Sequence, residues 1–172
     1  ARTMDGVHDL LLREGDLTPD ELLRRCVTDT VAESVTKLIR ARRMLEVRIA
    51  GENRLIAVEN AAWVRDALGI PLPPGLPEAF LEKATEGMVD LVRRFARTHG
   101  PFTTEECASR FGVANVIVET VLRHLMQAGR VVEGGFRPGG VHREWCDVEV
   151  LRTIRRKSLA RLRKEIEPVE QR

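Results

Sequence analysis

The sequence of 172 residues has no tyrosine and few other aromatic side chains, with only two tryptophans and five phenylalanines. Its core must therefore be built mainly from Leu, Val, Ile and Ala, which favours helices over a large sheet. The chain also lacks any apolar run of about 18 residues, the length that a membrane-spanning helix needs. Its first residues lack the apolar stretch of a secretion signal. We expect a soluble, cytoplasmic protein that does not bind a membrane.

Cysteine and histidine are scarce and scattered. Cys26, Cys107 and Cys146 form no Cys-x-x-Cys pair, and an odd, widely spaced set argues against a disulfide framework and against a zinc site. The four histidines have no carboxylate neighbours at ligand spacing, and no Ser/His/Asp or paired-carboxylate arrangement stands out. The sequence therefore predicts no catalytic residue, no metal and no cofactor.

Positive charge is concentrated at the C-terminal end of the chain. Residues 148–172 hold eight Arg or Lys and four Glu, a net charge of +4, so the first 147 residues carry −2 of the overall +2. Within this end, residues 152–164 contain seven basic residues and no acidic one. Such a run can attract polyanions through counterion release, or it can be a solvated helix face.

Two halves of the sequence resemble one another at a spacing of 85 to 87 residues. The paired segments are Leu17–Cys26 with Phe102–Phe111, Leu38–Ile49 with Leu125–Phe136, and Asn60–Arg65 with Asp147–Arg152. Internal similarity of this kind indicates two units of one architecture in tandem. Four prolines between Gly69 and Pro77 predict a stiff, extended connector. Because a unit of about 65 residues is near the lower limit for a self-sufficient core, we expect the units to pack against each other and against the C-terminal helix.

Each unit carries the local signals of three helices. Three Thr-x-x-Glu capping boxes mark helix starts, since the threonine hydroxyl and the glutamate carboxylate each satisfy a free backbone amide. They are Thr18–Glu21, Thr30–Glu33 and Thr103–Glu106. In the second unit, apolar residues from Val118 to Met126 recur at helical spacing, and Gly112 and Gly129 are placed to end helices.

A two-stranded hairpin follows the third helix in each unit. In the first unit, Met44–Ile49 and Arg54–Val58 read as strands joined across Gly51–Asn53. In the second, Arg130–Glu133 is followed by a strand that runs toward Trp145. Three helices closed by a hairpin are typical of the winged-helix variant of the helix-turn-helix.

We therefore predict a mainly α fold (α+β) with two tandem winged-helix modules, small β-hairpin wings and a basic C-terminal helix. The expected parts are a first module over residues 1–68, a Pro-rich connector over 69–86, a second module over 87–147 and the helix over 148–168.

Five segments of the second half carry a resemblance to a known family. They are His99–Thr103, Gly129–Gly134, Arg137–Gly140, Arg143–Arg152 and Arg155–Arg163. Together they closely resemble the C-terminal half of bacterial large helicase-related (Lhr) proteins. The resemblance is specific over residues 97–169 and softer but consistent over residues 36–82. It implies a fragment of a long superfamily 2 helicase, which translocates on single-stranded DNA with ATP and carries several winged-helix modules.

The chain itself lacks the motor motifs of such a helicase. It contains no Gly-x-x-x-x-Gly-Lys-Thr loop and no Asp-Glu-x-His box, so it cannot bind or hydrolyse ATP by that machinery. The resemblance also links these C-terminal regions to oligomer assembly and to a glycosylase-like module, but it carries no catalytic residue of either kind onto this segment. We expect no enzymatic activity in this fragment and an association with the nucleoid.

The candidate nucleic-acid-binding residues are basic side chains in three kinds of element. The third helix of a helix-turn-helix enters the major groove, and a wing can follow the phosphate backbone or the minor groove. The C-terminal helix can dock by an apolar stripe and still offer arginines to phosphate. The candidates are Lys37, Arg40, Arg43 and Arg123 in or beside the third helices, Arg48, Arg54, Arg137 and Arg143 in the wings, and Arg155, Arg156 and Lys157 in the C-terminal helix. Each can equally be a solvated surface residue.

Two functions from different classes stay open. The first is a nucleic-acid-binding or guiding segment of an Lhr-type helicase, acting through phosphate contacts on single-stranded DNA, duplex DNA or an RNA:DNA hybrid. The second is a winged-helix scaffold that holds the remainder of the helicase polypeptide or forms a homo-oligomer. A free-standing transcription factor is disfavoured, because the third helix of the second unit offers a nearly neutral face. A steep loss of binding with salt would favour the first function.

Overall fold

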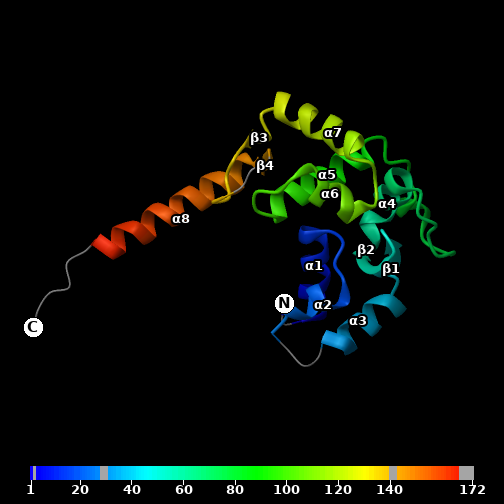
Figure 1. The fold of residues 1–172 in the computed structure, drawn as a ribbon. Coiled ribbons are helices and arrows are strands. Elements are labelled where there is room, and N and C mark those ends of the chain that lie inside the picture. The colour runs from blue at the N-terminus through cyan, green and yellow to red at the C-terminus, as the bar shows by residue number, and fades with distance from the viewer. Residues whose placement is uncertain (2, 28–30, 140–142, 167–172) are drawn as a thin grey trace, which may run out of the picture.

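The computed structural model describes residues 1, 3–27, 31–139 and 143–166. Within these residues the chain forms eight α-helices and two small antiparallel hairpins (Figure 1). The predicted mainly α fold with β-hairpin wings is thus confirmed. None of the helices in the described ranges is both long enough and apolar enough to cross a membrane.

The first unit begins at the N-terminus and ends with a short helix. Its elements are α1 (Met4–Glu14), α2 (Pro19–Arg25), α3 (Val31–Arg40), β1 (Met44–Ile49), β2 (Glu52–Ala57), the 3-10 turn η1 (Val58–Asn60) and α4 (Ala61–Leu68). The capping box predicted at α2 is present, because the Thr18 hydroxyl accepts from the Glu21 amide at 3.2 Å and the Glu21 carboxylate accepts from the Thr18 amide at 2.9 Å. Thr30, the predicted cap of α3, lies outside the described residues.

The second unit follows the connector and leads into the C-terminal helix. The connector contains the 3-10 turn η2 (Glu78–Phe80). The second unit consists of α5 (Gly87–Thr98), α6 (Thr104–Phe111), α7 (Asn115–Gln127), β3 (Val131–Gly134) and β4 (Glu144–Asp147), and α8 (Val148–Ile166) follows it. The capping box of Thr103 and Glu106 is confirmed at the start of α6. Gly112 ends α6 in the left-handed region at φ 67°, a conformation that glycine adopts without a steric penalty.

The same order of elements occurs in both units. In each, the segment between the first two helices pairs with the second hairpin strand through one isolated bridge, Leu17 with Leu55 and Phe102 with Trp145. Three helices, this short third strand and a closing hairpin are the winged-helix arrangement. The predicted fold of the two units is therefore confirmed.

The turn of the first hairpin differs from the prediction. The sequence analysis placed Gly51–Asn53 in the turn, but β1 and β2 pair as far as Ile49 and Glu52, so the turn consists of Ala50 and Gly51 alone. Both turn residues have positive φ, 51° and 82°. Two such residues form the tight turn whose twist matches that of the flanking strands, which is why Glu52 and Asn53 continue the ladder.

The first hairpin lies between two hydrophobic cores. Since successive residues of a strand point to opposite faces, Met44, Leu55 and Ala57 enter a core shared with α1, α2 and α3. Val47 and Ile56 enter a larger core made with α4 and the second unit. The predicted wing hairpin is thus present, and its strands contribute to both cores. The packing expected between the two units is confirmed.

The tip of the same hairpin also touches the second unit. A methyl group added to Gly112 would lie 3.2 Å from the Cα and Cβ atoms of Ala50. The connector packs along the larger core through Ile70 and Leu72, and Leu76 is buried in it. We keep the division into modules at residues 68 and 87 as a proposal based on the order of elements, because the larger core extends across both boundaries.

The C-terminal helix α8 leaves the body of the protein, and its residues 154–163 are exposed, so the packing expected against this helix was wrong for most of its length. Figure 1 shows it extending from β4 as a single long rod. Asp147 caps its first turn by accepting from the amides of Glu149 and Val150 at 2.8 and 3.2 Å. Farther along, Leu159 and Leu162 remain 56% and 53% exposed. The predicted end of this helix at residue 168 lies outside the described residues.

Candidate nucleic-acid interface

The two third helices present their predicted basic residues to solvent, with their charges partly neutralised. On α3, Lys37 pairs with Glu33 at 2.7 Å, whereas Arg40 is exposed and has no ion pair among the described residues. On α7, Arg123 pairs with Glu119 at 2.6 Å. The solvent-exposed face of α3 therefore has more uncompensated positive charge than that of α7.

Two of the three basic residues predicted in or just before the first hairpin bind other side chains of the protein. Arg43 is half-buried and donates to the carboxylate of Asp5 at 2.7 Å and meets Nδ1 of His8 at 3.1 Å. Arg54 is only 3% exposed and is held by carboxylates. Arg48 alone is exposed, and its Nε donates to the carbonyl of Gly51 at 3.1 Å. We therefore leave Arg43 and Arg54 out of the proposed interface.

Arg54 belongs to an ion cluster that joins the two units. Arg110 of α6 donates from Nε to Asp16 at 2.9 Å, and from Nη1 and Nη2 to Glu21 at 2.7 and 2.9 Å. Arg54 donates to the same carboxylate of Asp16. Burial alone would raise the pKa of Glu21, but the Arg110 and Thr18 hydrogen bonds hold that pKa down at about 2. The cluster therefore joins the two units, and the carboxylates of Asp16 and Glu21 compensate the charges of Arg54 and Arg110.

The second wing is also built around an internal carboxylate. Arg137 donates to Glu106 at 2.8 and 3.1 Å and pairs with Glu144, which is 1% exposed. The hydrogen bonds from Arg137, with the Phe136 amide, lower the pKa of Glu144 to about 2. Arg143 lies at the surface, 79% exposed, and pairs with Glu133 at 3.2 Å. Arg137 thus has a structural task, whereas Arg143 is accessible.

The predicted residues of α8 are the most available. Arg155, Arg156 and Lys157 are all exposed and have no ion pair among the described residues. Arg152, one turn earlier, pairs with Glu149. A long helix that offers uncompensated cations can follow a polyanion along its length.

A basic groove, which the sequence analysis missed, connects α8 with α5. We call it the α5–α8 groove. Two adjoining hollows of about 570 and 470 Å³ form it, and its basic residues are Arg93, Arg97, Arg130, Arg152 and Lys157. Arg97 lines both hollows. Arg93 and Arg97 lie one helical turn apart on the outer face of α5. This spacing is visible in the sequence, but the prediction for this helix used only its apolar residues.

Acidic residues also line the α5–α8 groove, but each has a partner. Asp147 accepts a hydrogen bond from the Glu149 amide at the start of α8. Glu149 forms an ion pair with Arg152, and Asp90, beside the groove, forms one with Arg93. Arg97, Arg130 and Lys157 therefore remain without an ion pair within the described part of the chain. In the same part, no group of three or more His, Cys, Asp or Glu side chains could hold a metal ion.

Comparisons with known proteins point in one direction. A family model described as the winged-helix domain of large helicase-related protein matches residues 1–83. The chain is 42% identical over 169 residues to a Mycolicibacterium smegmatis protein named Lhr helicase/probable uracil glycosylase. It is 33% identical over 172 residues to an Escherichia coli protein named Lhr helicase/uracil glycosylase. Each match covers 98% of this chain but only 11% of the relative's length.

Proposed function

Because this chain belongs to the large helicase-related family, we propose that it is a non-catalytic segment that binds or guides nucleic acid for a helicase of this type. It does so through contacts to the phosphate backbone with little preference for base sequence. Both relatives are named as helicases, a class of protein that acts on nucleic acid. We further propose that the bound nucleic acid is single-stranded DNA, duplex DNA or an RNA:DNA hybrid. The remainder of the helicase polypeptide as a partner and an association with the nucleoid belong to the same proposal.

The observation that supports this function most is the run of cations from the α5–α8 groove onto α8 that have no ion pair among the residues that the structure describes. Arg97 and Arg130 lie at its inner end, and Arg155, Arg156 and Lys157 follow on a helix of 19 residues. At 1.5 Å per residue this helix is about 28 Å long, enough to span several nucleotides. These five cations are exposed, and exposed guanidinium and ammonium groups along a helix suit contacts to the phosphate backbone, which carry no sequence information.

Salt dependence tests the proposal quantitatively. Five phosphate contacts to a single strand predict a slope of about −3.5 for log affinity against log salt. Raising salt fourfold, from 50 to 200 mM, should then weaken binding about a hundredfold. Fluorescence anisotropy with a labelled single-stranded oligonucleotide measures this directly. A slope near zero would contradict phosphate contacts as the source of affinity.

Paired charge-neutral variants locate the contact surface. Arg155→Gln with Arg156→Gln should make the slope shallower by about 1.4, since each lost contact removes about 0.7. Arg24→Gln with Lys83→Gln removes two exposed charges elsewhere and serves as the matched control. Equal slopes for the two double variants would exclude α8 from the interface.

A second function has its own supporting observation, the apolar positions along α8. Ile154, Leu159 and Leu162 are 38%, 56% and 53% exposed on a helix that extends away from the body. An uncovered stripe of this kind can bind a neighbouring domain or another copy of the chain. Absence of nucleic-acid binding at low salt, together with a defined oligomer that Leu159→Gln and Leu162→Gln dissociate, would favour the scaffold.

A further inference from the structure

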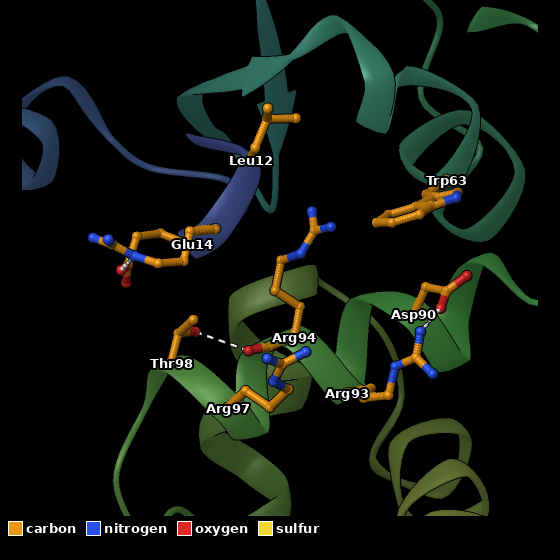
Figure 2. Close-up of a pocket in the computed structure, with 9 residues that line it drawn as sticks. Leu12, Glu14, Trp63, Asp90, Arg93, Arg94, Arg97 and Thr98 are labelled. Carbon is orange, nitrogen blue, oxygen red and sulfur yellow. Dashed lines mark hydrogen bonds and ion pairs between the residues drawn. The ribbon is translucent and has the colours of Figure 1, made fainter. Parts of the chain in front are cut away.

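A third hollow, of about 530 Å³, lies where the two units meet. It is formed by α1, α4 and α5 and adjoins the α5–α8 groove through Arg93 and Arg97, which line both. Figure 2 shows Arg94 projecting from α5 into this space, between Leu12 of α1 and Trp63 of α4. We call this hollow the Arg94 pocket.

Arg94 is placed in the Arg94 pocket without a partner for its charge. Its Nη1 is shielded from solvent and has no hydrogen-bond partner within the described part of the chain. Burial lowers the pKa of this guanidinium, yet an arginine stays protonated under ordinary conditions. Arg94 as a whole is half-buried, and a cation in such a position with an unsatisfied donor is stabilised when an anion approaches the guanidinium.

The surroundings hold the Arg94 guanidinium in one orientation. Its central carbon lies 4.5 Å from the ring centroid of Trp63, a cation–π contact that leaves the N–H edges free to donate. Gly15, at φ 96°, lets the side-chain stem pass, because a methyl group there would lie 2.9 Å from Arg94 Cδ. The donor is therefore positioned before any ligand arrives.

The charge balance of the Arg94 pocket is positive. Its basic residues are Arg13, Arg93, Arg94 and Arg97, and its acidic residues are Glu14 and Asp90. Glu14 is paired with Arg13 at 2.9 Å and Asp90 with Arg93 at 2.5 Å. Arg94 and Arg97 therefore remain to attract an anion.

We propose that the Arg94 pocket binds one phosphate of the nucleic-acid strand that lies in the α5–α8 groove, with Arg94 as the main donor and Arg97 at the rim. The inference rests on the proposed function, because the strand must first occupy the groove. Its chemistry is that of a phosphodiester or terminal phosphate held by a planar, charged donor.

The test combines affinity with the emission of Trp63. Arg94→Met should weaken binding of a single-stranded oligonucleotide about tenfold, the loss expected for a charge-assisted hydrogen bond. Arg24→Gln, which removes an exposed charge elsewhere, should stay within about twofold of the wild-type protein. The unlabelled oligonucleotide should change tryptophan emission in the wild-type protein and in Arg24→Gln, but not in Trp63→Phe. The second tryptophan, Trp145, is buried and 3% exposed, so it contributes a constant background.

Each outcome separates this inference from the proposed function. If the wild-type protein binds the oligonucleotide with the expected salt slope but Arg94→Met binds equally well, the pocket inference is wrong and the proposed function survives. If the wild-type protein binds no oligonucleotide at low salt, both are overturned. If inorganic phosphate alone changes Trp63 emission at the same concentrations as the oligonucleotide, the site belongs to free phosphate and the strand assignment is wrong.

Loss of the fold must not be mistaken for loss of the site. If Arg94→Met lowers the melting temperature or alters the far-UV circular dichroism spectrum, the exposed Arg97→Gln becomes the deciding variant, and an affinity equal to that of Arg24→Gln would refute the pocket.

Discussion

Removing Arg110 should loosen the junction between the two units. The Arg110 side chain is 13% exposed and pairs with Asp16, which is 9% exposed, and with Glu21, which is 26% exposed. Breaking a fully buried pair costs about 3–5 kcal/mol, because the remaining charge is left uncompensated. Since water reaches Glu21 in part, we expect Arg110→Ala to lower the free energy of unfolding by about 2–3 kcal/mol.

Thermal and urea unfolding measure this loss. For a chain of this length each kcal/mol lowers the melting temperature by about 2–4 °C, so the shift should be about 4–12 °C. Arg123→Ala is the matched control, because it removes an arginine from an exposed pair with Glu119 on α7. Exposed pairs contribute little, so this control should unfold close to the wild-type protein.

The pH dependence provides a stricter test of the same reasoning. The pKa of Glu21 is lowered from 4.5 to about 2, so its contribution to stability is present above pH 4.5 and is lost as the pH falls toward 2. In Arg110→Ala the hydrogen bond that lowers the pKa of Glu21 is gone, so burial raises this pKa. The variant therefore lacks the contribution to stability that the wild-type protein loses in acid. The stability gap between the two proteins should therefore narrow between pH 7 and pH 3. A gap that stays constant, or a loss no larger than that of Arg123→Ala, would refute the role of the cluster.

Two further predictions concern the core and the thiols. Leu122→Ala should lower the free energy of unfolding by about 2–5 kcal/mol in urea titrations, because Leu122 is fully buried in the larger core; a loss below about 1 kcal/mol would contradict the packing. A thiol reagent at pH 8 should modify Cys26, which is half-buried, well before Cys107, whose pKa burial raises to about 12. Equal rates for the two thiols in the native protein would contradict this order.

The sequence was sufficient to predict elements whose cause is local. A capping box needs only Thr103 and Glu106 three positions apart, and its two hydrogen bonds form within one helical turn. The first hairpin was predicted with the wrong turn, because Ala50 carries no local sign that it adopts positive φ. That conformation suits the tight link between Ile49 and Glu52, and the neighbouring Gly112 packs against it.

The candidate site was predicted less well, because the accessibility of an arginine depends on distant parts of the chain. Arg54 and Arg137 look like wing cations in the sequence, yet each meets carboxylates that are remote or buried in the fold. Conversely, Arg94 and Arg97 lie on the first helix of the second unit, which the helix-turn-helix pattern does not single out. The pocket that they line exists only because α1 and α4 of the first unit pack beside α5.

The two basic surfaces are supported in different ways, and this difference suggests different tasks. On α5, the apolar face with Leu91, Val92 and Phe95 is fixed in the larger core, so the outer arginines need only side-chain ordering to bind an anion. On α8, the cations lie along a projecting helix and are open to solvent from many directions. Under the proposed function, long-range attraction and rapid capture of a strand suit α8, whereas retention of a strand already in place suits the donors on α5.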